Sequence, residues 1–241
     1  MVLANAARLA LVGIRQEGAA FRLLESYAPL RPRVKALVMV PHGRTPSNEK
    51  LLFQSHREGP NATLLPESLT EAEKGADAFL DAYGDALDDC HFVRSPLHRC
   101  GQTAGVYEAV IRSRGPEPPR CASDPALVEI DHASWHGLTV DELTGADREA
   151  AVAQRAGDLL AAPADGESTL DVLERAAEWL ATLEAPGVCV AFGHGTFQNA
   201  CEVVLRTYGD REPADVFTRE PGRSHLRRGY PHLLYDEVVD G

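Results

Sequence analysis

The sequence predicts an α/β protein, a three-layer sandwich in which a mostly parallel central sheet is flanked by helices. Two apolar runs, residues 34–41 and 188–193, each lead into a histidine followed by a glycine. Between these runs, apolar residues recur at helical spacing over stretches long enough to serve as crossovers. Parallel strands need such crossovers, and ligands gather at the carboxyl ends of the strands. We therefore expect one sheet with a ligand site at that edge.

The composition is that of an acidic globular protein. The chain has 241 residues, of which 44% are hydrophobic and 25% charged, and its formal net charge is −12. This charge argues against nucleic-acid binding, which requires a basic patch. Five cysteines without a CxxC spacing predict reduced thiols rather than a zinc ribbon or a disulfide framework. The apolar N-terminal stretch has no basic leader and is interrupted by Arg8, which predicts a cytoplasmic protein without a signal peptide or membrane span.

Residues 1–33 precede the first strong strand, and we expect them to form a helical arm ahead of an α/β domain over residues 34–241. Apolar residues at helical spacing in this arm predict one or two short helices packed on the outside of the domain. The alternative is an arm through which two copies of the chain pair as a homodimer.

The first half of the domain alternates strands and helices. An irregular polar stretch, residues 46–68, precedes a helix expected from Thr70, where Glu73 completes the spacing of a capping box, to about Tyr83. A short strand around residues 92–93 leads into a second helix over residues 98–113.

The second half continues the alternation. An extended piece over residues 127–130 is followed by a loop around Trp135, and residues 140–160 are rich in alanine and acids, which favours a helix. Ser168 and Asp171 are spaced to cap another helix. The second strand then leads into a helix that ends near Arg206, and a last strand is expected over residues 232–239.

Four ionisable side chains lie where strands are expected to end. His42 and His194 follow the two apolar runs, Arg99 opens the helix over residues 98–113, and Glu129 ends an extended run. Together they suit phosphoryl transfer. A neutral imidazole can attack phosphorus, cations hold the oxygens, and a carboxylic acid protonates the leaving alkoxide.

Four segments, in order, resemble motifs of the histidine phosphatase superfamily, which has the phosphoglycerate-mutase-like fold. PHGRT with a later N, from residue 41, resembles RHGET…N, and SPLHRCGQTA, from residue 95, resembles SPLxRAxQTA. LVEIDHASWHG, from residue 127, resembles LxExxxGxWEG, and FGHG, from residue 192, resembles a late SHG. The resemblance covers roughly residues 34–205.

The resemblance implies roles for nine residues. His42 would become a phosphohistidine, Arg99 and His194 would bind the phosphoryl group, and Glu129 would donate a proton and later activate water. Further contacts to phosphate or substrate would come from Gly43, Arg44, Asn48, Gly195 and Thr196. The resemblance implies no metal and no other cofactor.

The main departure from the motifs is Pro41, which stands where the family has an arginine that donates to the phosphoryl oxygens. Losing one preorganised donor costs about 2.7–4 kcal/mol of transition-state stabilisation, or roughly 100- to 1,000-fold in rate. Arg44 replaces the family's acidic residue and is one hypothesis for a substitute charge; a solvated Arg44 is the equal alternative. Other basic residues are expected at the solvated surface, although they could contact a polar substrate: Lys50, His56, Arg57, Arg227 and Arg228.

His132 and His136 have the i, i+4 spacing of a metal site on a helix. Gly137 and the resemblance place them in a loop instead, so we expect no metal there.

These observations predict a phosphomonoesterase that acts on a small phosphorylated metabolite through a phosphohistidine at His42. One alternative, suggested by Pro41, is a repurposed family member that binds or transforms a phosphorylated or carboxylated ligand without phosphatase chemistry. A second alternative is a phosphoglycerate-mutase-like phosphotransferase, although the segment around Trp135 more closely resembles the phosphatase branch.

Overall fold

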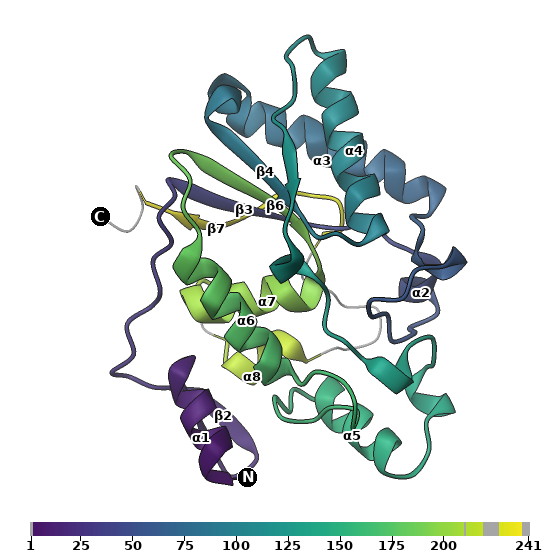
Figure 1. The fold of residues 1–241 in the computed structure, drawn as a ribbon, viewed down its shortest axis with the longest axis vertical. Coiled ribbons are helices and arrows are strands. Elements are labelled where there is room, and N and C mark those ends of the chain that lie inside the picture. The colour runs from purple at the N-terminus through teal and green to yellow at the C-terminus, as the bar shows by residue number, and fades with distance from the viewer. Residues whose placement is uncertain (1, 210, 219–226, 238–241) are drawn as a thin grey trace.

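The centre of the fold is a five-stranded sheet of order β5-β4-β6-β3-β7 (Figure 1). The computed structural model describes residues 2–209, 211–218 and 227–237. β7 runs antiparallel to β3, and the other neighbouring strands are parallel, which confirms the predicted α/β class. The strands are β3 (Ala36–Pro41), β4 (Cys90–Arg94), β5 (Cys121–Ser123), β6 (Val188–Gly193) and β7 (His232–Asp236).

Long helices cover both faces of the sheet. In Figure 1, α3 and α4 lie above the sheet, and α6 and α7 lie below it. These helices are α3 (Pro66–Tyr83), α4 (His98–Ser113), α6 (Thr169–Thr182) and α7 (Gly195–Leu205).

Successive residues of β3 face opposite helix layers, as the pleat of a strand requires. Val38 and Val40 pack in a cluster with Phe79 of α3, whereas Leu37 and Met39 belong to the cluster on the other face. Every residue of β3 is buried. An apolar run without alternation is therefore what a central strand of this sheet needs.

The other helices of the α/β domain lie in the connections between these elements. They are α2 (Pro46–Glu49), α5 (Gly145–Arg155), α8 (Pro213–Phe217) and the 3₁₀ helices η1 (Pro60–Ala62), η2 (Gly84–Asp89), η3 (Pro125–Leu127), η4 (Ala133–Trp135) and η5 (Val140–Glu142). No helix in the described part of the chain is both long and apolar enough to cross a membrane.

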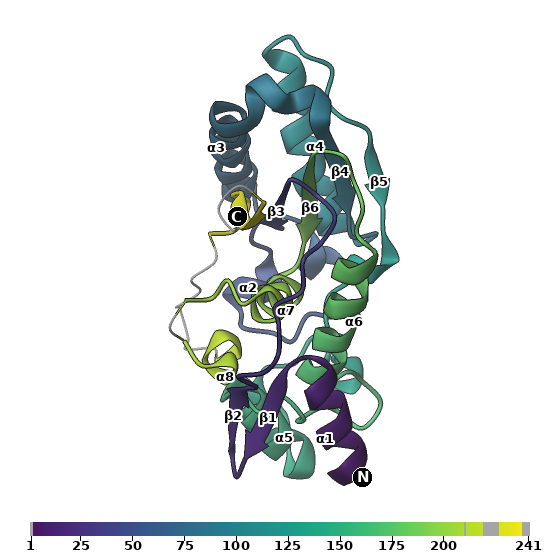
Figure 2. The same ribbon diagram turned by 90° about the vertical axis from the view of Figure 1, so that its left-hand side faces the viewer.

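The N-terminal arm is helical in its first part only. After α1 (Val2–Leu11), the strands β1 (Ile14–Glu17) and β2 (Ala20–Leu23) form a hairpin, so the prediction of a wholly helical arm is wrong there. Gly18 opens the two-residue turn with φ +63°, a conformation that favours glycine. Figure 2 shows the arm at the bottom of the molecule, where β2 contacts α8. Arg8 of α1 is bonded to Glu174 of α6 at 2.8 Å.

The helix boundaries of the structure agree with the predicted boundaries for α4 and for the start of α6 but differ for the start of α3. α4 spans the predicted residues, and the Ser168–Asp171 capping box opens α6 as expected. α3 begins at Pro66 rather than at Thr70, because proline suits the first position of a helix, where no N–H bond is needed.

Two expected strands differ from the structure. Residues 127–130 form no strand: Asp124 caps η3, which ends at Leu127, and Glu129 follows in a loop. The last strand, β7, ends at Asp236; residues 238 and 239 of the expected strand lie outside the described residues.

Candidate active site

His42 follows β3 directly and is almost fully buried. Its backbone N–H donates to the Gly193 carbonyl oxygen at 2.9 Å, which continues the pairing of β3 with β6. The ring Nδ1 lies 2.7 Å from the Gly43 carbonyl oxygen. Because a carbonyl oxygen can only accept, Nδ1 carries the proton and Nε2 carries the lone pair. The local backbone therefore fixes the tautomer that a nucleophilic imidazole needs.

Arg99 reaches His42 from the first turn of α4. Its Nε lies 3.3 Å from His42 Nε2, and Nη2 donates to the Ser55 carbonyl oxygen at 3.3 Å. The third nitrogen, Nη1, is buried and has no hydrogen-bond partner in the described part of the chain. A buried donor without an acceptor costs roughly 1–3 kcal/mol. A bound anion would supply the missing acceptor.

A second guanidinium, from Arg228, also lies at His42. Its Nη1 is 3.4 Å from His42 Nε2, and the residue is half-buried just before β7. No pattern in the surrounding sequence distinguishes Arg228 from the other basic residues expected at the surface, and its half-buried position beside His42 corrects that expectation.

His194 lies at the corresponding end of β6 and precedes α7. Its ring centroid is 5.2 Å from that of His42, and the rings are tilted by 63°. Nε2 is 2.9 Å from Ser95 Oγ and 3.3 Å from Cys100 Sγ. The first turn of α7, which begins at Gly195 and Thr196, carries the partial positive charge of a helix N-terminus.

Burial and positive charge keep both histidines neutral. Burial, followed by Arg228 and Arg99, lowers the pKa of His42 well below its usual value of 6.5. Burial, followed by Arg99 and His42, lowers the pKa of His194 in the same way. A neutral His42 with a lone pair on Nε2 is the form able to attack an electrophile.

Glu129 lies in the loop after η3 and is 8% exposed. Its Oε1 accepts a hydrogen bond from the Ile130 N–H at 3.0 Å, and its carbonyl oxygen lies 2.6 Å from His56 Nε2. Burial raises the pKa of the Cys100 thiol to about 12; Arg99 opposes this rise and Glu129 adds to it. The Glu129 carboxylate is thus within electrostatic reach of a thiol that contacts His194.

Hydrogen bonds pair residues 53–55 with residues 136–138 next to the site. The Phe53 N–H donates to Leu138 and the Gly137 N–H to Phe53, each at 2.8 Å, and the Ser55 N–H donates to His136 Nδ1 at 3.0 Å. His132 packs against Phe53 with ring centroids 4.8 Å apart. His132 and His136 therefore lie in a loop that supports the site.

Two of the residues predicted to contact phosphate make other hydrogen bonds in this structure. Asn48 Oδ1 accepts from the Thr45 N–H at 3.0 Å, so Asn48 caps α2. Arg44 is exposed, and its carbonyl oxygen accepts from Leu65. Gly43 is buried, and its N–H donates to Thr103 Oγ1 at 3.1 Å. The structure brings His42, Arg99 and His194 together, and no hydrogen bond within the described part of the chain holds Arg44 or Asn48 against them.

Comparison with known proteins defines the family. The model of the histidine phosphatase superfamily (branch 1) matches residues 37–215, and the chain therefore belongs to this superfamily. A comparison with curated protein sequences gives no match.

Several solved structures share the fold. A mycobacterial glucosyl-3-phosphoglycerate phosphatase is 24% identical, with a TM-score of 0.59 over 76% of this chain and 84% of that one. A putative α-ribazole-5′-P phosphatase from Escherichia coli is 16% identical, with a TM-score of 0.59 over 83% and 95% of the two chains. A mutant phosphoserine phosphatase from Entamoeba histolytica, in complex with phosphoserine, is 20% identical, with a TM-score of 0.55 over 83% and 94%. At these identities the similarity establishes the fold.

Proposed function

We propose that the protein is a phosphomonoesterase that hydrolyses a small phosphorylated metabolite through a phosphohistidine at His42. One observation carries the proposal: the unprotonated Nε2 of His42 lies 3.3 Å from Arg99, whose Nη1 is buried without an acceptor. A nucleophile therefore lies beside a donor that an anion would satisfy.

In the first step, His42 Nε2 forms a bond to phosphorus while the bond from phosphorus to the ester oxygen breaks. Arg99 and His194 hold the equatorial oxygens, and Gly43, Gly195 and Thr196 provide further contacts to the phosphate or the substrate. Glu129, in its protonated form, gives its proton to the leaving alkoxide. Because Ile130 occupies Oε1, the other carboxyl oxygen is the one that exchanges the proton.

In the second step, water attacks the phosphorus of the phosphohistidine. The Glu129 carboxylate takes a proton from the water as the bond between phosphorus and Nε2 breaks. Inorganic phosphate leaves, and His42 and Glu129 return to their starting forms. The cycle uses no metal, so turnover should survive dialysis against a chelator.

The class of substrate is proposed from the similar structures. Those named above are described as phosphatases for glucosyl-3-phosphoglycerate, α-ribazole-5′-P and phosphoserine, which are all small phosphorylated metabolites. Membership in the same superfamily favours this class for the present chain. Five free cysteines agree with a reducing, cytoplasmic location.

The test is incubation with a panel of sugar phosphates and small-acid phosphates, followed by an assay of released phosphate. An acid quench during turnover should reveal acid-labile phosphate on the wild-type protein and none on His42→Ala. His98→Ala is a matched control, because His98 is exposed beside Arg99, and it should retain the phosphoprotein.

Two results would contradict the proposal. Ligand binding without phosphate release or phosphoprotein would favour a repurposed binding protein. Transfer of the phosphoryl group within or between substrates, dependent on a bisphosphate primer, would favour a phosphotransferase.

A further inference from the structure

Two guanidinium groups meet one nitrogen atom in this site. Arg99 Nε lies 3.3 Å and Arg228 Nη1 lies 3.4 Å from His42 Nε2. A neutral imidazole nitrogen offers one lone pair, so it cannot satisfy two cationic donors equally. Two like charges held this close in a largely buried site favour binding of an anion between them.

We propose that Arg228 is a phosphoryl-binding residue and supplies the guanidinium that is missing at position 41. The inference rests on the proposed function, because it assigns a ligand to the same phosphoryl group that His42 attacks. The residue comes from the turn before β7, near the C-terminal end of the chain, and not from the end of β3.

The backbone directly after this arginine is fixed to the core. The Gly229 N–H donates to the Pro41 carbonyl oxygen at 2.7 Å, and the buried Tyr107 hydroxyl donates to the Gly229 carbonyl oxygen at 2.9 Å. Both anchors are one residue away from Arg228. The segment is thus attached to the end of the strand that delivers the nucleophile, and Pro41 itself provides one of the attachment points.

The contact between Arg228 and His42 defines the movement that phosphate binding requires. A phosphorus atom in line for attack lies about 3–3.5 Å from the nucleophile, which is the distance now taken by Arg228 Nη1. The guanidinium must therefore turn from the Nε2 lone pair towards the phosphoryl oxygens. A long, unbranched side chain on an anchored backbone can make this change without moving the loop.

The loss of Arg228 should have two effects, one on the rate and one on its pH dependence. Removing one preorganised donor to a transition-state oxygen lowers kcat by roughly 100- to 1,000-fold. Arg228 also lowers the pKa of His42, together with burial and Arg99, so its loss raises that pKa. The acid limb of the activity profile should then move to higher pH, since His42 must be neutral to attack. The charged and titratable groups that act on His42 here are Arg99, Arg228 and His194.

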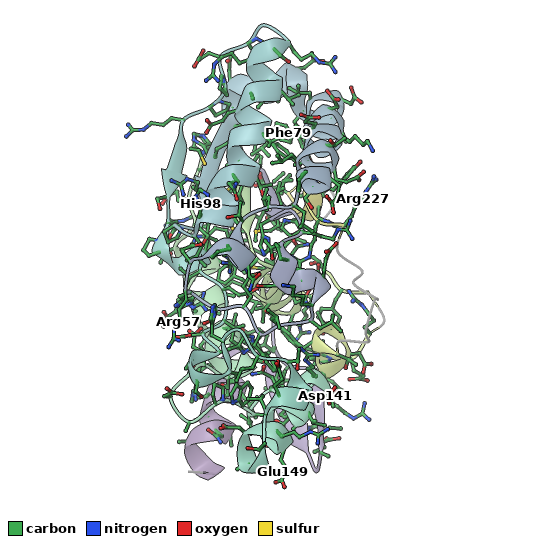
Figure 3. All side chains as sticks on the ribbon, turned by 90° about the vertical axis from the view of Figure 1, so that its right-hand side faces the viewer. Arg57, Phe79, His98, Asp141, Glu149 and Arg227 are labelled. Carbon is green, nitrogen blue, oxygen red and sulfur yellow. The ribbon has the colours of Figure 1, made fainter. Side chains whose placement is uncertain are left out.

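The experiment compares Arg228→Met, which keeps the aliphatic stem, with Arg228→Lys, which keeps the charge. Arg227→Ala is the matched control: Arg227 is adjacent but exposed, bonded to Glu71 at 3.3 Å. Figure 3 shows Arg227 at the right-hand surface of the molecule, with His98 and Arg57 at the left. The readouts are kcat/KM, its pH profile, thermal unfolding, and calorimetric binding of inorganic phosphate.

We expect Arg228→Met to lose at least 100-fold in kcat/KM and to bind phosphate more weakly. Its acid limb should lie at higher pH, and the unfolding temperature should be close to that of wild type. Arg228→Lys should recover part of the loss, and Arg227→Ala should stay within about twofold of wild type. Arg228→Met activity equal to or above that of Arg227→Ala, with equal phosphate affinity, would overturn the inference; higher activity would identify Arg228 as an obstructing group.

The phosphate measurement separates this inference from the proposed function. Phosphate binding that depends on Arg228, without hydrolysis by the wild type, would refute the proposed phosphatase activity but support Arg228 as a phosphate-binding residue. Hydrolysis by the wild type with unchanged behaviour of Arg228→Met would do the reverse. A wild type that neither hydrolyses the panel nor binds phosphate would refute both.

Discussion

The substitution Gly75→Ala tests how the site depends on the contact between α3 and the turn that carries Arg228. Gly75 lies in α3, where the added Cβ would be 2.0 Å from the Gly229 carbonyl oxygen and 2.8 Å from the Tyr107 hydroxyl. Carbon and oxygen do not approach within 3.0 Å in such contacts. The Gly229 carbonyl must therefore move by about 1 Å or more, and Arg228 must move with it.

The effects on stability and activity should separate. Alanine gains about 1 kcal/mol over glycine within a helix, whereas two strained or broken hydrogen bonds at Gly229 cost about 0.5–1.5 kcal/mol each. The net loss is therefore about 0–2 kcal/mol, so the unfolding temperature should fall by only a few degrees. A displacement of 1 Å in a catalytic site can cost about 100-fold in rate, and we expect a loss of that order in kcat/KM.

Gly105→Ala is the matched control. Gly105 is also inside a helix, but its added Cβ would meet no atom within 4 Å, so this variant should keep full activity and gain stability. Gly75→Ala combined with Arg228→Met should be no less active than Arg228→Met alone, because both act through the same side chain. The reasoning fails if Gly75→Ala is as active as Gly105→Ala, or if the losses in the double variant simply add.

Three further predictions concern the same pocket. Pro41→Arg should change the wild-type rate little but raise kcat/KM of Arg228→Met at least tenfold; an equal gain in both backgrounds would argue against a shared role. Glu129→Gln should slow alkyl phosphates by about 100- to 10,000-fold, yet release a burst of nitrophenolate from 4-nitrophenyl phosphate and accumulate phosphoprotein; equal losses on both substrates would speak against proton donation. Because the folded-state pKa of His42 is lowered, only the unfolded chain takes up this proton as the pH falls through 6.5, and stability declines below that pH. Urea unfolding at pH 7 and pH 5.5 should show a shallower decline for His42→Gln, by up to about 1.4 kcal/mol per pH unit, and equal slopes would exclude a buried neutral imidazole.

The residues that the sequence identifies well are those whose position depends on nearby chain. His42 and His194 each end an apolar run and precede glycine, and the run alone is enough to make a buried strand. The bounds of α4 also follow from local signals, and Arg99 needs only the first turn of that helix to reach the site. For these residues, the strand or helix that carries the side chain also determines that it points into the site.

Other positions depend on contacts that no local pattern encodes. Leu127 and Val128 have the composition of a strand, but Asp124 caps the 3₁₀ helix η3, which ends at Leu127, so Glu129 reaches the site from a loop. Arg228 has no helical or strand periodicity around it. Its place is set by Gly75 and Tyr107, which are far away in the sequence, and a single sequence gives no sign that they meet.

Pro41 and Arg228 are best understood as one structural exchange. The His42 N–H points to β6, and successive residues of a strand point their N–H groups to opposite neighbours, so the amide of residue 41 points towards the β7 side. There the β7 ladder has already ended at the pair Met39–His232, and a missing N–H leaves no ladder bond unmade. The carbonyl oxygen on that side still accepts from Gly229. Proline thus removes one candidate phosphate ligand from the strand while its carbonyl helps hold the turn that carries another. An arginine on the strand would be as rigid as the sheet, whereas the phosphate binding that we propose for Arg228 requires its turn to stay docked on α3, α4 and β3.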